Sequence, residues 1–220
     1  LIHAGAENET EVQVISLHSE HLNTGNVQES LNFLDGLIVA PGFGERGVEG
    51  KITAIKYARE NKIPFFGICL GMQMAVIEYA RNQVGLLDAN STEMSPNCKI
   101  PVIDLMESQK KIIKKGGTMR LGAWDCDLIE NTHAADAYSI KSISERHRHR
   151  YEFNNDYLDK IFDENFIVAG TNPDTGLVEI IECKNHPWFV GVQFHPEYKS
   201  TVSTPHPLFK SFVKASLAKK

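Results

Sequence analysis

The chain has 220 residues, of which 42% are hydrophobic and 23% are charged, with 23 basic and 28 acidic side chains and a formal net charge of −5. This composition is that of a globular domain with an ordinary core, which excludes a disordered chain, a collagen-like repeat and a coiled coil. No apolar run approaches the roughly 20 residues of a membrane span. The excess of acidic over basic side chains argues against a protein that binds nucleic acid or anionic lipid. The four scattered cysteines suit neither a disulfide framework nor a zinc site, so we expect no metal.

The first half of the chain predicts alternating strands and helices. Its opening residues read like the end of a helix, and we expect a domain excised from a longer, cytoplasmic protein. Strands are expected at residues 12–16, 36–40 and 63–68, and helices at residues 50–60 and 70–81. This alternation predicts βαβ units, and therefore a parallel sheet with helices on both faces.

The second half of the chain predicts short strands between Gly, Pro, Asn and Asp turns. The expected strands are residues 102–105, 118–123, 140–143, 166–170, 177–182 and 188–193, and the expected helices are residues 155–162 and 206–217. Lysines gather in residues 95–117, which we expect to form a mobile surface loop. No repeat or linker divides the chain, so residues 1–220 are expected to form one α/β domain with antiparallel additions.

The sharpest local motif is a cysteine bracketed by glycines, where an apolar segment gives way to a helix. Residues 67–71 read GICLG, a form of the nucleophile elbow, in which a tight strand-to-helix turn holds the central side chain in a strained, exposed pose. The positive end of the helix should lower the thiol pKa from its free value of about 8.5, and the next N–H should serve an oxyanion. The alternative for Cys69 is a buried cysteine that packs as a small hydrophobe.

A thiolate nucleophile needs a base, and His195 has the most suitable context of the nine histidines. It follows the apolar segment at residues 188–193, in a turn fixed by Pro196. Glu197 can accept a hydrogen bond from the imidazole and hold its tautomer, so Cys69, His195 and Glu197 predict a triad of nucleophile, base and orienter. The alternative is an ordinary His-Pro-Glu turn.

A glycine-rich loop, PGFG at residues 41–44, ends the preceding strand. The carboxyl ends of neighbouring parallel strands meet at one edge of a sheet, where ligands bind. The loop should therefore open beside the elbow and supply a second oxyanion donor. The alternative is a glycine-rich turn without a ligand.

Together these motifs resemble those of the class-I, triad glutamine amidotransferases. The strings GICLGMQ (67–73) and HPE (195–197) carry that resemblance. Four further strings are similar to the glutaminase domains of the CTP synthase family: PGFGERGVEGK (41–51), DANSTE (88–93), GGTMRLG (116–122) and ERHRHRYE (145–152). The resemblance covers most of the chain and implies a flavodoxin-like α/β fold, with an open, mostly parallel central sheet, helices on both faces and antiparallel additions in the second half.

The resemblance implies that Cys69 attacks the side-chain amide of L-glutamine, forms a glutamyl thioester and releases ammonia. His195 would relay the proton and Glu197 would orient it, while Gly42 and Leu70 would donate to the oxyanion. The implied glutamine-binding residues are Gly42, Phe43, Gln73, Glu93, Arg150 and Tyr151. Their chemistry fits a free amino acid, whose ammonium suits Glu93 and whose carboxylate suits backbone N–H groups or Arg150.

Arg120 matches a family segment associated with GTP as an allosteric activator, and an exposed arginine beside a glycine-rich loop suits a nucleotide. Three features depart from the family. Pro41 stands where the family has a glycine and has no N–H, which leaves Gly42 as the donor. The family's first strand is expected ahead of Leu1, and the chain has no GxxxxGK[ST] loop for ATP. We therefore expect the synthetase domain, with its ATP and Mg²⁺, to lie outside this chain.

The resemblance implies a parent reaction that uses the ammonia to convert UTP to CTP with ATP. The expected partners are L-glutamine and a synthetase domain of the same polypeptide, in a homo-oligomer, with no nucleic acid, no membrane and no cofactor in this domain. Two other functions stay open. A γ-glutamyl peptidase on the same elbow would hydrolyse a glutamyl peptide faster than free glutamine. In a non-catalytic, GTP-binding regulatory domain, binding would survive Cys69→Ala.

Overall fold

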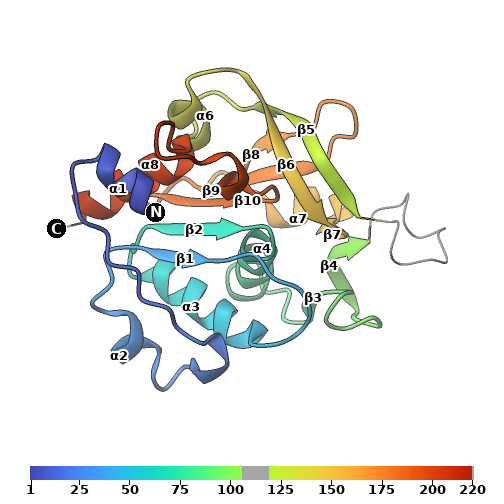
Figure 1. Cartoon of the computed structure of the whole chain (residues 1–220). Coiled ribbons are helices and arrows are strands. Elements are labelled where there is room, and N and C mark those ends of the chain that lie inside the picture. Colours follow the sequence, from blue (N-terminus) through green and yellow to red (C-terminus); the bar gives the residue numbers. More distant parts are fainter. Residues whose placement is uncertain (106–118, 220) are drawn as a thin grey trace.

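The computed structural model describes residues 1–105 and 119–219 (Figure 1). The helices are α1 (Ile2–Glu7), α2 (Val27–Leu31), α3 (Val48–Glu60), α4 (Leu70–Asn82), α6 (His133–Tyr138), α7 (Leu158–Ile161) and α8 (Pro207–Ala218), with 3₁₀ turns at Ser19–His21, Asn155–Tyr157 and Pro196–Lys199. The strands are β1 (Leu37–Val39), β2 (Phe65–Ile68), β3 (Ala89–Ser91), β4 (Ile100–Leu105), β5 (Arg120–Leu128), β6 (Ser142–His149), β7 (Tyr151–Phe153), β8 (Phe166–Thr171), β9 (Val178–Cys183) and β10 (Phe189–Val192).

The central sheet has seven strands in the order β1-β2-β10-β9-β8-β5-β6. Strands β1, β2 and β10 are parallel, and the remaining neighbours pair antiparallel. A smaller sheet has the order β3-β4-β7. The predicted α/β fold with antiparallel additions in the second half is confirmed, and parallel pairing in the central sheet is confined to three strands. Strands β8, β9 and β10 follow one another through connections too short for a parallel crossover, which explains their antiparallel pairing.

Two hydrophobic cores lie on opposite faces of the central sheet. Alternation along β2 sends Phe65 to one core, which α3 and α4 cover, and Phe66 to the other, which α1, α6 and α8 cover. Figure 1 shows α3 below β1 and β2, with α1 and α8 beyond the opposite face. Helices on both faces make β2 a fully buried strand, so its carboxyl end is a rigid place from which to hold a side chain.

Most predicted elements are confirmed within a few residues, and the largest errors involve strands. The strand predicted at residues 12–16 is wrong, because this exposed segment pairs with no strand among the described residues. The segments predicted at 118–123 and 140–143 overlap a long hairpin, in which β5 begins at Arg120 and β6 at Ser142; residue 118 lies outside the described residues. The predicted loop at residues 95–117 contains β4, and its lysine-rich portion, residues 106–118, lies outside the described residues.

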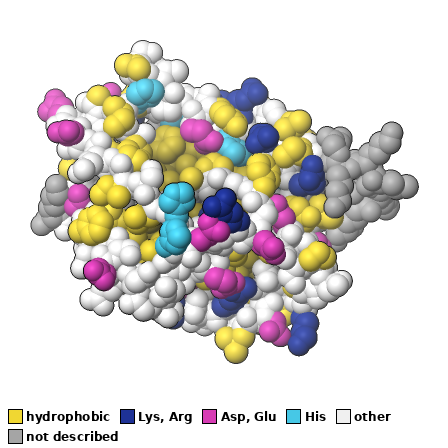
Figure 2. Space-filling view, turned by 60° about the horizontal axis from the view of Figure 1, so that its bottom comes forward, with side chains coloured by type: hydrophobic (Ala, Val, Ile, Leu, Met, Phe, Trp, Pro, Cys, Tyr) yellow, Lys and Arg dark blue, Asp and Glu magenta, His cyan; other side chains and the backbone are white. Residues whose placement is uncertain are grey.

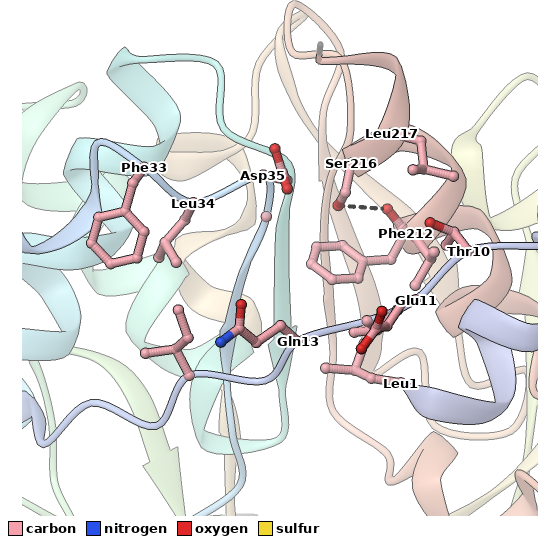
Figure 3. Close-up of a pocket in the computed structure, with 14 residues that line it drawn as sticks. Leu1, Thr10, Glu11, Gln13, Phe33, Leu34, Asp35, Phe212, Ser216 and Leu217 are labelled. Atoms are coloured by element: carbon pink, nitrogen blue, oxygen red, sulfur yellow. Dashed lines mark hydrogen bonds between the residues drawn. The ribbon is translucent and has the colours of Figure 1, made fainter.

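The outer edge of β1 borders a groove (Figure 3). Its two cavities have volumes of about 820 and 420 Å³. One wall carries Phe33, Leu34 and Asp35, and the opposite wall carries Phe212, Ser216 and Leu217. The Leu37 N–H bonds to Pro64 O on the β2 side, so the peptide groups of Ile38 point towards the groove. The groove therefore lies along the edge of the sheet at β1, which no described residue pairs as a further strand.

The described surface mixes charge signs. Figure 2 shows the lower side of Figure 1 turned towards the viewer, where basic and acidic side chains are interspersed and hydrophobic side chains gather around a hollow. The exposed hydrophobic side chains of the first 33 residues include Val14, Ile15, Leu17 and Phe33. None of the described helices has both the length and the apolar character needed to cross a membrane.

Candidate active site

Cys69 lies in the turn between β2 and α4, with φ 52° and ψ −101°. Glycines permit this turn: a Cβ on Gly67 would lie 2.7 Å from the Gly71 backbone, and a Cβ on Gly71 would lie 2.2 Å from Val39 O. The left-handed φ of a non-glycine residue is a strained conformation that the surrounding packing must hold. The turn therefore has the backbone geometry expected of a nucleophile elbow.

The environment of the Cys69 thiol differs from the prediction. Its side chain is buried rather than exposed, with a relative exposure of 2% for the residue. Burial raises the pKa of Cys69 to about 12, and the hydrogen bond from Leu70 N–H opposes that rise only in part. The expected lowering of the thiol pKa is wrong, because desolvation outweighs the hydrogen bond from the helix N-terminus.

His195 and Glu197 form a close pair after β10. His195 Nδ1 lies 2.6 Å from Glu197 Oε1, and the imidazole stacks on Tyr198. A carboxylate only accepts, so Nδ1 carries the proton and Nε2 presents its lone pair. His195 Nε2 is buried and has no partner among the described residues. An unpaired imidazole nitrogen in this tautomer has the state needed for a general base.

The parallel pairing of β2 and β10 brings the cysteine and histidine segments together. Ile68 is in register with Val192, and Cys69 donates its backbone N–H to Val192 O at 2.7 Å. Gln193, the next residue, places its side-chain Nε2 3.7 Å from Cys69 Sγ. His195 follows two residues later, so both chain segments reach the same edge of the sheet.

The glycine-rich loop at residues 41–44 lies against the elbow, as predicted. A Cβ on Gly42 would lie 3.1 Å from Leu70 Cδ2. Gly44 N–H donates to Glu93 Oε1 at 2.9 Å, which ties this loop to the carboxylate expected to bind the substrate ammonium. Phe43 is half exposed beneath the Arg148 guanidinium, 5.3 Å from its ring centre.

Of the remaining predicted glutamine-binding residues, Gln73 and Tyr151 are linked by hydrogen bonds to Gln193 beside Cys69. Gln73 Nε2 donates to Tyr151 O at 2.8 Å and to Gln193 Oε1 at 3.1 Å. Both hydrogens of this nitrogen are therefore used within the protein, and Gln73 can meet a ligand only through its oxygen. Arg150 Nε is buried without a partner among the described residues, as a donor awaiting a carboxylate would be.

Arg120 does not have the exposed position expected of a nucleotide contact. Its side chain is 2% exposed, and its Nη1 lies 2.6 Å from Glu179 Oε1 and 3.6 Å from Glu152 Oε2. Burial raises the pKa of Glu152 to about 8 and that of Glu179 to about 7 despite this arginine. Arg120 is a buried counter-ion for two carboxylates that come from different sheets, Glu152 on β7 and Glu179 on β9.

Sequence reasoning missed Gln193, Arg148 and the buried pair His147 and His149. Gln193 lies between Val192 and Phe194, at the end of the predicted strand 188–193. An amide side chain at such an apolar position could have indicated a functional residue. The run at residues 145–152 entered the prediction only as a family string and through Arg150 and Tyr151. In β6 the residues alternate, so arginines 146 and 148 face outwards and both histidines face inwards. Hydrophobic periodicity overlooks such a strand because its buried positions are polar.

The sequence matches the model of the family described as glutamine amidotransferase class-I over residues 1–215. The chain is 65% identical over 216 residues to a CTP synthase of Flavobacterium johnsoniae, covering 98% of this chain and 40% of that protein. It is 58% identical over 216 residues to a CTP synthase of Clostridium acetobutylicum, with the same coverage. The chain thus spans about 40% of the length of these relatives.

Solved structures that are similar to this chain include a glutaminase domain of the same kind. The CTPS glutaminase domain of Trypanosoma brucei, with bound acivicin, matches with a TM-score of 0.92 and 37% identity, covering 99% of this chain and 85% of that one. A protein from Thermoplasma acidophilum, named for GMP synthase, matches with a TM-score of 0.63 and 16% identity, over 98% of this chain and 86% of that one, and shows the fold alone. The chain therefore belongs to the class-I glutamine amidotransferase family, within the branch of the CTP synthase glutaminase domains.

Proposed function

We propose that this domain hydrolyses L-glutamine to glutamate and ammonia through a thioester on Cys69. The observation that carries the proposal is the meeting of two strand ends. The elbow after β2 presents Cys69, and the turn after β10 presents His195 Nε2, unpaired among the described residues and oriented by Glu197. Nucleophile, base and orienter thus come from one rigid sheet edge, as covalent acyl transfer requires.

In the first half of the reaction, Cys69 Sγ attacks the side-chain amide carbon of glutamine while its proton passes to His195 Nε2. The N–H groups of Leu70 and Gly42 donate to the oxygen that becomes negative. The C–N bond then breaks, and the proton on His195 goes to the leaving nitrogen, which departs as ammonia. A water molecule next attacks the thioester and gives its proton to His195, so that glutamate and the free thiol are restored.

Binding of the amino-acid end of glutamine uses charges around the same edge. Glu93, fixed by Gly44 N–H, receives the ammonium, and Arg150 Nε, which no described residue pairs, receives the carboxylate. Phe43 and Tyr151 flank the aliphatic chain, and Gln73 offers its oxygen. Donors that the substrate brings to the thiol would oppose the effect of burial, which favours the protonated form of Cys69.

The ammonia is consumed by a synthetase domain of the same polypeptide, which uses ATP to convert UTP to CTP. This part of the proposal rests on the CTP synthase relatives, of which the chain covers about 40%. That domain would hold ATP and Mg²⁺, GTP would act as activator, and the full protein would be a homo-oligomer. Because the T. brucei domain carries bound acivicin, we also expect acivicin to bind here.

The direct test is the release of glutamate and ammonia from L-glutamine, with Cys69→Ala as the matched control. We expect slow turnover with the two products in equal amounts, and none in the variant. Turnover that persists in Cys69→Ala would refute the thioester mechanism. Faster hydrolysis of a γ-glutamyl peptide than of glutamine would instead identify a peptidase.

A further inference from the structure

The amide side chain of Gln193 lies against the sulfur of Cys69 in a region closed to solvent. Gln193 is completely buried, and its Nε2 lies 3.7 Å from Cys69 Sγ. Its backbone N–H donates to Glu179 O at 2.9 Å, which fixes the side chain to the centre of the sheet. The contact therefore joins two groups whose backbones are both held by strand hydrogen bonds.

The hydrogen bonds around Gln193 determine which end of its amide faces the sulfur. Tyr151 O can only accept, so the group that Gln73 directs at it, 2.8 Å away, is the NH₂. The second hydrogen of that NH₂ points at Gln193, 3.1 Å away, and therefore meets Oε1. The NH₂ of Gln193 is left facing Cys69 Sγ as a donor.

A pair of buried histidines holds the Tyr151 carbonyl, on which the orientation of the Gln193 amide depends. His149 Nδ1 lies 3.0 Å from Tyr151 O and must donate to it, so His149 Nε2 accepts from His147 Nδ1 at 2.9 Å. Burial lowers the pKa of His147 to about 2 and that of His149 to about 3, which keeps both rings neutral and each tautomer single. Every bond from His147 to the sulfur thus has a defined direction.

A thiolate in this position needs donors from the protein, because Cys69 is only 2% exposed to solvent. The charged groups that act on the thiol are Glu197 after β10, Glu93 after β3 and Arg148 on β6, and the His195 imidazole follows the strand paired with β2. The two carboxylates oppose ionisation of the thiol, and Arg148 favours it. A neutral donor fixed next to the sulfur stabilises the anion without introducing another buried charge.

We propose that Gln193 donates a hydrogen bond that stabilises the Cys69 thiolate, and that Gln73 and the His147–His149 pair are positioning residues that keep its NH₂ turned to the sulfur. The proposal deepens the proposed function and rests on it, because it takes Cys69 as the nucleophile. It also assigns Gln73 a role in the free domain, before any ligand binds.

The test is the rate at which iodoacetamide alkylates Cys69, measured from neutral to alkaline pH by mass spectrometry of the Cys69 peptide. Gln193→Leu preserves most of the volume and removes the donor, and we expect alkylation at neutral pH to slow about tenfold, as for a thiol pKa raised by about one unit. Gln193→Glu should slow it further, because a carboxylate repels the thiolate. Gln28→Leu, on the exposed surface of α2, is the matched control.

An unchanged alkylation rate in folded Gln193→Leu, judged by circular dichroism, would overturn the proposal. If that variant does not fold, Gln73→Leu replaces it, with a smaller slowing expected because the Gln193 amide is then free to flip; no slowing there also overturns it. Iodoacetamide needs no glutamine pocket, so slowed alkylation in a protein without glutamine turnover would support the donor and contradict the proposed hydrolysis of glutamine by this chain.

Discussion

Cys69 combines a strained backbone with a buried side chain, and both depend on its immediate neighbours. A non-glycine residue with a φ of 52° costs about 1–3 kcal/mol. Two contacts hold it there: the Cys69 N–H bond to Val192 O, and the close approach of Gly71 to Val39. The thiol is thereby placed at the end of β2, where its ionisation depends on a few donors instead of on solvent.

Because Gly71 lies so close to Val39, we predict that Gly71→Ala strongly destabilises the fold. The new Cβ would lie 2.2 Å from Val39 O, a backbone atom of the adjacent parallel strand, and β1 would have to move. We expect a loss of about 3 kcal/mol in the free energy of unfolding, measured by urea denaturation. Gly176→Ala is the control, because its Cβ enters open space and meets only the cost of a left-handed φ, about 1 kcal/mol. Equal losses in the two variants would contradict the close approach.

A buried ion pair joins α3 to α4 beside their shared hydrophobic core. Arg59 on α3 donates from Nε and Nη2 to the two carboxylate oxygens of Glu78 on α4, at 2.9 and 2.7 Å. The Glu78 side chain is completely buried and that of Arg59 is 11% exposed. Because α4 begins at the elbow, this pair anchors the helix whose N-terminus faces the thiol.

We predict that Arg59→Met costs about 3 kcal/mol in the free energy of unfolding, because it leaves the Glu78 carboxylate buried without its partner. The double variant Arg59→Met/Glu78→Leu should recover most of that loss. The free energy of unfolding of each variant is measured by thermal and urea denaturation. Lys141→Met, in the exposed pair with Glu130, should change little. A double variant no more stable than Arg59→Met would show that the pair does not act as a unit.

Elements with strong periodicity could be predicted from the sequence, and elements defined by their partners could not. Helices α3 and α4 and strand β2 follow from apolar spacing alone. The segment at residues 12–16 alternates like a strand but has no strand partner among the described residues, and a strand exists only when it is paired. Strands β3 and β7 were missed because each has three residues and is stabilised by pairing with β4.

For the whole molecule, the buried histidines of β6 link stability to pH. Burial lowers the pKa of His147 to about 2 and that of His149 to about 3, whereas both rings titrate near 6.5 when unfolded. When a base has a lower pKa in the folded state than in the unfolded state, its contribution to the free energy of unfolding is complete above the unfolded-state pKa. This contribution is lost progressively as the pH falls below that value. Each histidine therefore removes about 2 kcal/mol of stability between pH 7.5 and pH 5.

The corresponding experiment compares the free energy of unfolding at these two pH values for the native chain and for His149→Gln. The variant is less stable at both values, since it loses the bonds of the ring, but we expect its decrease between them to be smaller by about 2 kcal/mol. His18→Gln removes a histidine from the exposed surface and serves as control. A decrease in His149→Gln equal to the native one would show that His149 is not buried in its neutral form.

The composition of the candidate site was predictable, whereas its connections were not. Local motifs identify Cys69, His195 and Glu197, because an elbow and a His-Pro-Glu turn are short-range patterns. The chain of bonds through Gln193, Gln73 and Tyr151 joins segments up to 120 residues apart, and no local pattern encodes it. Arg120 was placed on the surface for the same reason, since its partners lie on other strands.

The central claim is that Cys69 is a nucleophile directed at glutamine, and a covalent label tests it most directly. The chain is incubated with a diazoketone analogue of glutamine, and its intact mass is measured, with Cys69→Ala in parallel. We predict one adduct, equal to the analogue less dinitrogen, that protection with L-glutamine reduces and that the variant lacks. No adduct in the folded native chain, or an equal adduct in Cys69→Ala, would contradict the account.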